Sequence, residues 1–303
     1  MLGAILTTFF FALSGVTGQR VAVRLGSMWG NFIRLLLAAV VLGILVALFY
    51  RDSISSETFG WFFFSGIVGF GIGDIALFAA YERIGSRLTI LLNLCFAPLF
   101  AMAMEYLWLG NAVTGRVVFL ASLILIGVIM AIRPGAKSRQ IIERRGLYGA
   151  GVVAAIVAGF GQGIGAVLSR KAEEVATIAG VEVGGISAAF QRVFAGVVIA
   201  GIVVLLVRFF GSKRLWKDWR TPLNKSLAPW LIGAALFGPV IGVSFFQWAL
   251  KSQESGIVLA VVATTPIVMM PLSAITEGDR PSLLSIFGAI IAVAGVVLLN
   301  VWV

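Results

Sequence analysis

The segments that decide the fold are long apolar runs, such as VVFLASLILIGVIMAI over Val117–Ile132 and GIVLAVVATTPIVMMPLSAIT over Gly256–Thr276. Many such runs reach the roughly 17–25 residues that a helix needs to cross a bilayer. Hydrocarbon offers no partner to backbone N–H and C=O groups, so only helices or a closed barrel can span it. Barrel strands alternate apolar and polar residues, which these runs do not. The sequence therefore predicts an all-α, polytopic membrane protein.

The composition supports a membrane protein and argues against other classes. Of the 303 residues, 60% are hydrophobic and 12% are charged, against about 25% charged in soluble proteins. The formal charge of +10 sits in short loops between apolar runs, which fits the positive-inside rule better than nucleic-acid binding. Histidine is absent and Cys95 is the single cysteine. We therefore expect no intrachain disulfide, no enzymatic activity, no cofactor and no metal site.

Hydropathy divides the chain into ten expected helices. The N-terminal segment has no basic region and no convincing cleavage site, so we expect a mature first helix rather than a signal peptide. Their ranges are 2–19, 31–50, 59–81, 88–109, 116–132, 147–168, 185–207, 228–250, 256–276 and 282–301.

The chain also repeats itself. A shift of 168 residues places Pro98 on Pro266 and Gly127 on Gly295, and a shift of 158 places Arg34 on Arg192. A weaker shift of 146 places Arg24 on Arg170. We interpret the chain as two similar halves, residues 1–136 and 137–303, with five helices each. Because five is odd, the second half enters the membrane inverted, which is typical of alternating-access transporters with a site between the repeats.

Charge predicts an orientation. Sixteen Lys and Arg residues fall in the loops after helices 1, 3, 5, 7 and 9, and five fall on the other side. The positive-inside rule then places both termini outside the cytoplasm.

The pattern resembles the drug/metabolite transporter superfamily in its ten-helix EamA-like branch, over essentially the whole chain. The resemblance rests on Phe32-Ile33-Arg34 and Phe190-Gln191-Arg192, on helices carrying Ala97-Pro98 and Thr265-Pro266, and on the turns Leu109-Gly110-Asn111 and Glu277-Gly278-Asp279. It implies transport of a small metabolite, and it implies cytoplasmic termini, contrary to the charge count. The helix-1 Glu of the related small multidrug-resistance proteins is absent here, which argues against their type of cationic drug exchange.

Charged residues inside the apolar runs are the first candidates for a site, because each costs about 2.5–3.5 kcal/mol to insert. Arg34 and Asp74 should lie at similar depth, and we predict an ion pair between them. The pair could bind substrate or gate protons; alternatively, Arg34 reaches the interface and Asp74 caps a break. Arg192 has Gly242 where Arg34 has Asp74. It could bind an anionic group, or it could pair with an acid of the preceding loop, namely Glu173, Glu174 or Glu182.

Neutral polar residues form a second set of candidates. Asn93, Gln162 and Gln247 could line a polar cavity or could bond between helices. Trp248 could stack on a substrate or could belong to an interfacial aromatic belt. The equivalent Pro98 and Pro266 predict paired bends that serve as gate hinges. The glycine-rich stretches at 69–73 and 159–165 could permit close helix packing or local unwinding.

Together these features predict a multi-pass transporter of the inner or plasma membrane, which exports or exchanges a small metabolite such as an amino acid. Its partners would be the metabolite, the bilayer and either protons or a counter-substrate, with Asp74 as the proton-coupling candidate. The alternative is a lipid flippase subunit or a non-transporting membrane partner.

Overall fold

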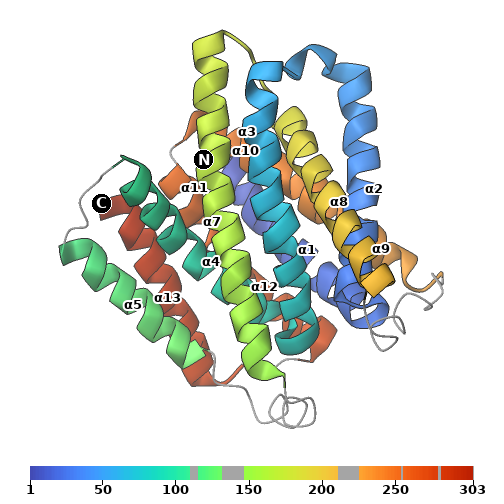
Figure 1. The fold of residues 1–303 in the computed structure, drawn as a ribbon. Helices are drawn as coiled ribbons and strands as arrows, with labels where there is room; N and C mark the ends of the chain where they lie inside the picture. Colours follow the sequence, from blue (N-terminus) through green and yellow to red (C-terminus); the bar gives the residue numbers. More distant parts are fainter. Residues whose placement is uncertain (110–114, 132–146, 211–224, 254, 279–280, 303) are drawn as a thin grey trace.

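The computed structural model describes residues 1–109, 115–131, 147–210, 225–253, 255–278 and 281–302. The proposed boundary between residues 136 and 137, and the turn residues Asn111 and Asp279, lie outside these ranges. The elements are α1 (Leu2–Leu25), α2 (Ser27–Phe49), η1 (Arg51–Ser53), α3 (Ser56–Gly66), η2 (Ile67–Gly73), α4 (Asp74–Leu109), α5 (Gly115–Ala131), α7 (Tyr148–Ala179), α8 (Gly185–Phe210), α9 (Ala228–Ala235), η5 (Leu236–Gly242), α10 (Val243–Ser252), α11 (Ser255–Val262), α12 (Thr265–Glu277) and α13 (Leu283–Trp302). The described chain is thus a bundle of helices (Figure 1).

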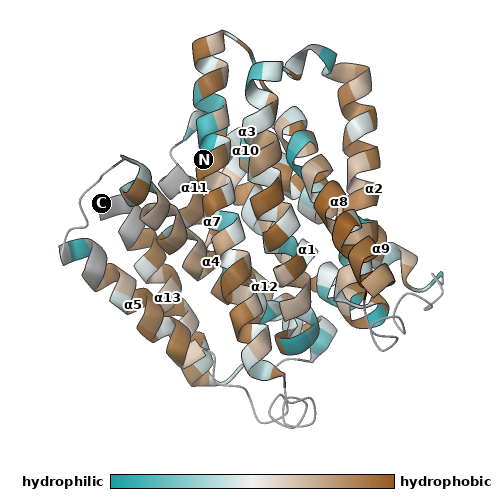
Figure 2. Cartoon of the chain, in the orientation of Figure 1, coloured by the Kyte–Doolittle hydropathy of each residue, from teal (hydrophilic) through white to brown (hydrophobic). Residues whose placement is uncertain are grey.

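Six helical segments are long and apolar enough to cross a membrane. Large apolar side chains such as Phe119 on α5 and Phe209 on α8 point away from the bundle. Figure 2 shows hydrophobic residues along the middle of α5 and α8, and hydrophilic residues towards the upper end of α7. This distribution fits lipid around the bundle and water at its ends.

The longest of these segments, Ser56–Trp108, spans 53 residues, which is far more than one crossing requires. Gly85 interrupts it with φ 78° and ψ 174°, a conformation that side chains with a Cβ avoid. The rings of Trp61 and Trp108 stack with centroids 6.0 Å apart. Since these residues flank Gly85 at nearly equal distances along the sequence, the segment is a hairpin that turns at Gly85.

Several helix boundaries differ from the sequence expectation. α1 continues to Leu25 and α7 continues to Ala179, because polar residues are compatible with a helix that has left the hydrocarbon. The added turns of α7 contain the Lys171–Glu174 ion pair at 3.0 Å, and Gly180 ends the helix in the left-handed conformation. The predicted helix 256–276 is divided into α11 and α12 just before Pro266. Pro98 does not interrupt α4, which stays helical there.

Two segments, η2 and η5, are π-helical. Their positions in the chain correspond closely at the 168-residue offset. In η2 the backbone lies so close to α7 that a Cβ on Gly161 would be 2.5 Å from the Gly73 Cα. The glycines of 159–165 therefore serve close packing in a regular helix, whereas those of 69–73 lie in a locally widened one. π-Helical turns occur frequently at functional sites.

Candidate functional site

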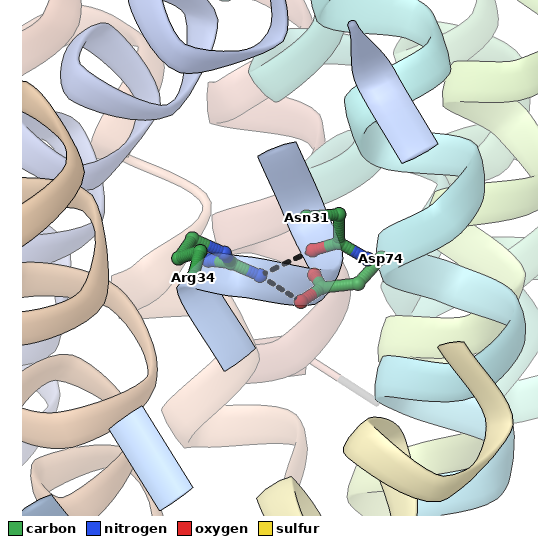
Figure 3. Close-up of polar contacts among 3 residues, drawn as sticks. All are labelled: Asn31, Arg34 and Asp74. Carbon is green, nitrogen blue, oxygen red and sulfur yellow. Dashed lines mark hydrogen bonds and ion pairs between the residues drawn. The ribbon is translucent and has the colours of Figure 1, made fainter. Parts of the chain in front are cut away.

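The centre of the bundle holds the predicted ion pair. Arg34 Nη2 on α2 donates hydrogen bonds to Asp74 Oδ2 on α4 and to Asn31 Oδ1, the latter at 3.0 Å (Figure 3). Asn31 and Arg34 are three residues apart, so they share one face of α2. The side chains of Arg34 and Asp74 are 4% and 12% exposed. The prediction of an Arg34–Asp74 pair is confirmed, and the alternative that Arg34 reaches the interface is wrong.

The Arg34 guanidinium also lies against an aromatic ring of its own half and a glycine of the other half. Its Cζ lies 4.6 Å from the centroid of the Phe78 ring, a cation–π contact. On another side, a Cβ on Gly238 of η5 would lie 3.1 Å from Arg34 Nη1. The absence of a side chain at Gly238 therefore leaves room for the guanidinium against η5.

Arg192 on α8 lies beside the same pair and is 2% exposed. Its Cζ is 5.4 Å from the Phe70 ring centroid, and its charge acts on Asp74 through space. A Cβ on Gly69 or Gly165 would lie 2.9 or 3.1 Å from its Nη2. Within the described part of the chain Arg192 makes no hydrogen bond or ion pair, and its Nε is enclosed without an acceptor.

The acids of the α7 end do not neutralise Arg192, contrary to one of the two sequence interpretations. Glu182 pairs with Lys251 at 2.9 Å, and Glu174 pairs with Lys171. Glu173 is buried, with its Oε1 unpartnered. The reason is geometric: α7 continues well past the apolar run, so these acids lie at the end of the bundle and Arg192 lies at its centre.

Arg34, Asp74 and Arg192 line a small cavity of about 60 Å³, a volume that corresponds to roughly two waters. Its polar lining comes from Ser14, Arg34, Asp74, Tyr81, Asn93, Gln162 and Arg192, and its apolar walls include Phe11, Phe70 and Phe246. Both halves of the chain contribute. The structure therefore brings together five residues that were predicted from the sequence, namely Arg34, Asp74, Asn93, Gln162 and Arg192.

Comparison with known families identifies the kind of protein to which this cavity belongs. The family model described as "EamA-like transporter family" matches residues 1–133 and 149–301. The chain belongs to the EamA-like transporter family. The predicted membership of the drug/metabolite transporter superfamily is thereby confirmed, and the chain is a multi-pass membrane protein of a transporter family.

Other comparisons add the fold but no function. A solved structure titled "Crystal structure of protein" is similar to this EamA-like protein with a TM-score of 0.58 and 17% identity, and the match covers 99% of this chain and 94% of that one. At this identity the likeness shows the fold alone. No curated protein sequence matches the chain.

Four other predicted residues of this EamA-like protein lie away from the cavity lining. Gln247 is fully buried, with neither terminal amide atom partnered. Trp248 is 46% exposed and packs on Phe245. Pro98 and Pro266 are buried but do not line the cavity.

Sequence reasoning missed Tyr81, Ser14 and Gly238. Tyr81 lies seven residues after Asp74, two turns along the same helix face, so helical periodicity could have found it. Ser14 and Gly238 had no comparable signal.

Polar contacts join helices near both ends of the α11–α12 segment. Near the end of α12, Arg20 donates to the Thr276 carbonyl, and the Ser86 N–H and hydroxyl donate to Glu277. Near the start of α11, Arg170 donates to the Leu250 carbonyl at 2.7 Å. Lys251 there holds the pKa of the Glu182 carboxyl below its usual value through a hydrogen bond and its charge. Polar contacts between described residues thus join helices at both ends of the bundle that contains the cavity.

Proposed function

We propose that the protein is a secondary transporter of a small organic metabolite such as an amino acid, acting as an exporter or exchanger in the inner or plasma membrane. It works by alternating access, with its site between two inverted repeats. The observation that carries this proposal is the small cavity whose buried charged and polar lining comes from both halves of the chain. Buried charge is expensive in a membrane and is typical of substrate pathways.

Ten crossings account for the described helices. The Gly85 hairpin divides Ser56–Trp108 into two crossings, α9–η5–α10 forms one, and α11–α12 forms another. The remaining crossings are α1, α2, α5, α7, α8 and α13.

Reciprocal contacts support a pseudo-two-fold relation between the halves. A Cβ on Gly43 would lie 3.2 Å from the Phe190 ring, and a Cβ on Gly201 would lie 3.2 Å from the Phe32 ring. These four residues exchange places at the 158-residue offset. A two-fold axis produces such reciprocal contacts: when a residue of the first half touches a residue of the second half, their two counterparts touch as well.

A second pair of helices shows the same exchange. A Cβ on Gly127 of α5 would lie 2.4 Å from Ala292 N, and a Cβ on Gly295 of α13 would lie 2.8 Å from the Ile124 side chain. The 168-residue offset carries Gly127 onto Gly295 and Ile124 onto Ala292. Five-helix halves related in this way have opposite membrane orientation, which supports inverted repeats.

Alternating access requires that each end can open in turn. Breaking the Ser86–Glu277 contacts at one end, or the Glu182–Lys251 pair at the other, would let the helices separate on that side while the contacts on the opposite side stay in place. A cavity of about 60 Å³ is smaller than the pockets of several hundred Å³ that hold small ligands. The cavity would therefore have to widen for a metabolite to bind.

Counterflow in liposomes tests the proposal. Vesicles that contain the full-length protein are loaded with an unlabelled amino-acid mixture, and uptake of each labelled amino acid is measured. Two double-cysteine variants, Ser86→Cys/Glu277→Cys and Glu182→Cys/Lys251→Cys, are joined by a short bifunctional reagent. We expect counterflow in the unmodified protein and its loss when either end is joined. Movement of fluorescent lipid without amino-acid counterflow would contradict the proposal and support the flippase alternative.

A further inference from the structure

The central cavity holds more positive than negative charge. Among the described residues that line it, Arg34, Asp74 and Arg192 are the charged ones. The other polar groups, Ser14, Tyr81, Asn93 and Gln162, are neutral in their ordinary protonation states. Two guanidiniums therefore face one carboxylate, which leaves an excess of one positive charge inside an otherwise apolar bundle.

The surplus charge belongs to Arg192, and the fold accommodates it specifically. Its guanidinium fits against Gly69 and Gly165, where a Cβ would approach Nη2 to 2.9 and 3.1 Å, and it lies over the Phe70 ring. Arg34, by contrast, already donates to Asp74 and Asn31. Arg192 has no hydrogen bond or ion pair in the described chain although it is 2% exposed and lines the cavity. A buried charge is normally paired, so Arg192 is placed to receive a partner that comes from outside the protein.

Asn93 adds a second requirement. Its Oδ1 is enclosed without a donor on the same cavity. Buried polar atoms are normally satisfied, so the missing partner carries a hydrogen-bond donor as well as an anionic group.

We propose that Arg192 and Arg34 form an anion-binding site, and that the substrate is a small carboxylate of net charge −1 with a hydroxyl or ammonium donor. This inference rests on the proposed transport function. The substrate carboxylate binds Arg192 in the fork geometry that guanidinium and carboxylate share. The substrate carboxylate competes with the Asp74 carboxylate for Arg34. Asp74 therefore pairs with Arg34 while no substrate is bound. One monoanion brings the charge of the cavity to zero, whereas a zwitterion leaves the surplus in place.

Thermal-shift titration of the purified full-length protein tests the site with matched probes. The monoanions are L-glutamate, L-aspartate and L-lactate, and their neutral-side-chain or uncharged counterparts are L-glutamine, L-asparagine and lactamide. We expect at least one monoanion, and none of the counterparts, to raise the melting temperature.

Variants separate a binding role of Arg192 from a structural one. Arg192→Gln should weaken monoanion binding by about 30-fold or more, the usual loss when one partner of a buried charge pair is truncated. Arg192→Lys should retain part of the affinity. Asp74→Asn should tighten binding by about tenfold, because it removes the internal competitor. Arg116→Gln, at an exposed arginine at the start of α5, is the control and should bind as the unchanged protein does.

Stability gives an independent readout. Arg192→Gln removes an unpaired buried charge, so without ligand it should melt at the same temperature as the unchanged protein or higher. A structural arginine would show a lower melting temperature and unchanged ligand affinity, and that result would overturn the proposal. Stabilisation by the uncharged counterparts alone, or no stabilisation by any monoanion at millimolar concentration, would also overturn it.

Transport measurements keep this inference separate from the proposed function. Arg192-dependent binding without counterflow would leave the anion site standing and reject transport. Counterflow of neutral amino acids that is insensitive to Arg192→Gln would leave transport standing and reject the anion site.

Discussion

Gly161→Ala tests whether the contact between α7 and η2 fixes the cavity wall. The added Cβ would lie 2.5 Å from Gly73 Cα and 2.8 Å from the Val68 carbonyl oxygen. Carbon atoms in contact are about 3.5–4.0 Å apart, so the two backbones must separate by roughly 1–1.5 Å. The atoms opposite belong to the backbone, so no side-chain rotation can relieve the overlap. Overpacking of this kind typically costs about 1–3 kcal/mol.

The assay is the melting temperature of the purified protein, with Gly60→Ala as the matched control. Gly60 is also helical, but a Cβ there would meet nothing within 4 Å, so alanine should leave stability unchanged or raise it by up to about 1 kcal/mol. Each kcal/mol corresponds to about 2–4 °C in chains of 150–250 residues. We expect Gly161→Ala to melt several degrees lower and to lose ligand-induced stabilisation, because η2 carries Gly69 and Phe70. Equal melting temperatures for both variants would refute the reasoning.

Three further predictions concern the ion pair, the hairpin and the orientation. Asp74→Asn should lower the melting temperature more than Arg34→Gln does. Asp74→Asn leaves two buried guanidiniums without a carboxylate, at a cost of about 3–5 kcal/mol, whereas Arg34→Gln still leaves Asp74 beside Arg192. A lower melting temperature for Arg34→Gln than for Asp74→Asn would contradict this reasoning. Gly85→Ala should destabilise the protein by about 1–3 kcal/mol from its backbone alone, because φ 78° and ψ 174° are adopted almost only by glycine. The added Cβ would also lie 2.9 Å from Glu277 Oε2. Gly115→Ala, which meets nothing within 4 Å, should be neutral, and equal effects of the two variants would argue against the hairpin turn. Charge predicts that tags on both termini react with an impermeant reagent in intact cells, and protection of both tags would favour the cytoplasmic termini that the family resemblance implies.

The helical class and the ion pair were predictable because both follow from strong local costs. Apolar runs of bilayer length leave the backbone no alternative to helix, and an ionisable residue in such a run needs a partner at its own depth. Arg34 and Asp74 met that condition and are paired.

The rest of the site depends on packing between distant segments. The position of Arg192 follows from glycines on two other elements, Gly69 and Gly165, and no spacing in the sequence links them. The position at which α7 ends could not be predicted from hydropathy either, because an amphipathic helix can continue into water after its apolar run has ended. The π-helical turns have no hydropathy signature. The sequences around Pro266 and Pro98 are similar, although the helix is divided just before Pro266 and continuous at Pro98.

The unequal charge of the two halves has a consequence for how the protein is made. Arg34 finds its carboxylate within the first half, so that half can leave the translocon with its buried charge already neutralised. Arg192, in the second half, packs against Gly69 and Phe70 of the first half and interacts electrostatically with Asp74 of that half. The ribosome synthesises the first half before the second. A gene cut between them should therefore give a first half that inserts and persists alone, and a second half that survives only when the first is produced beside it.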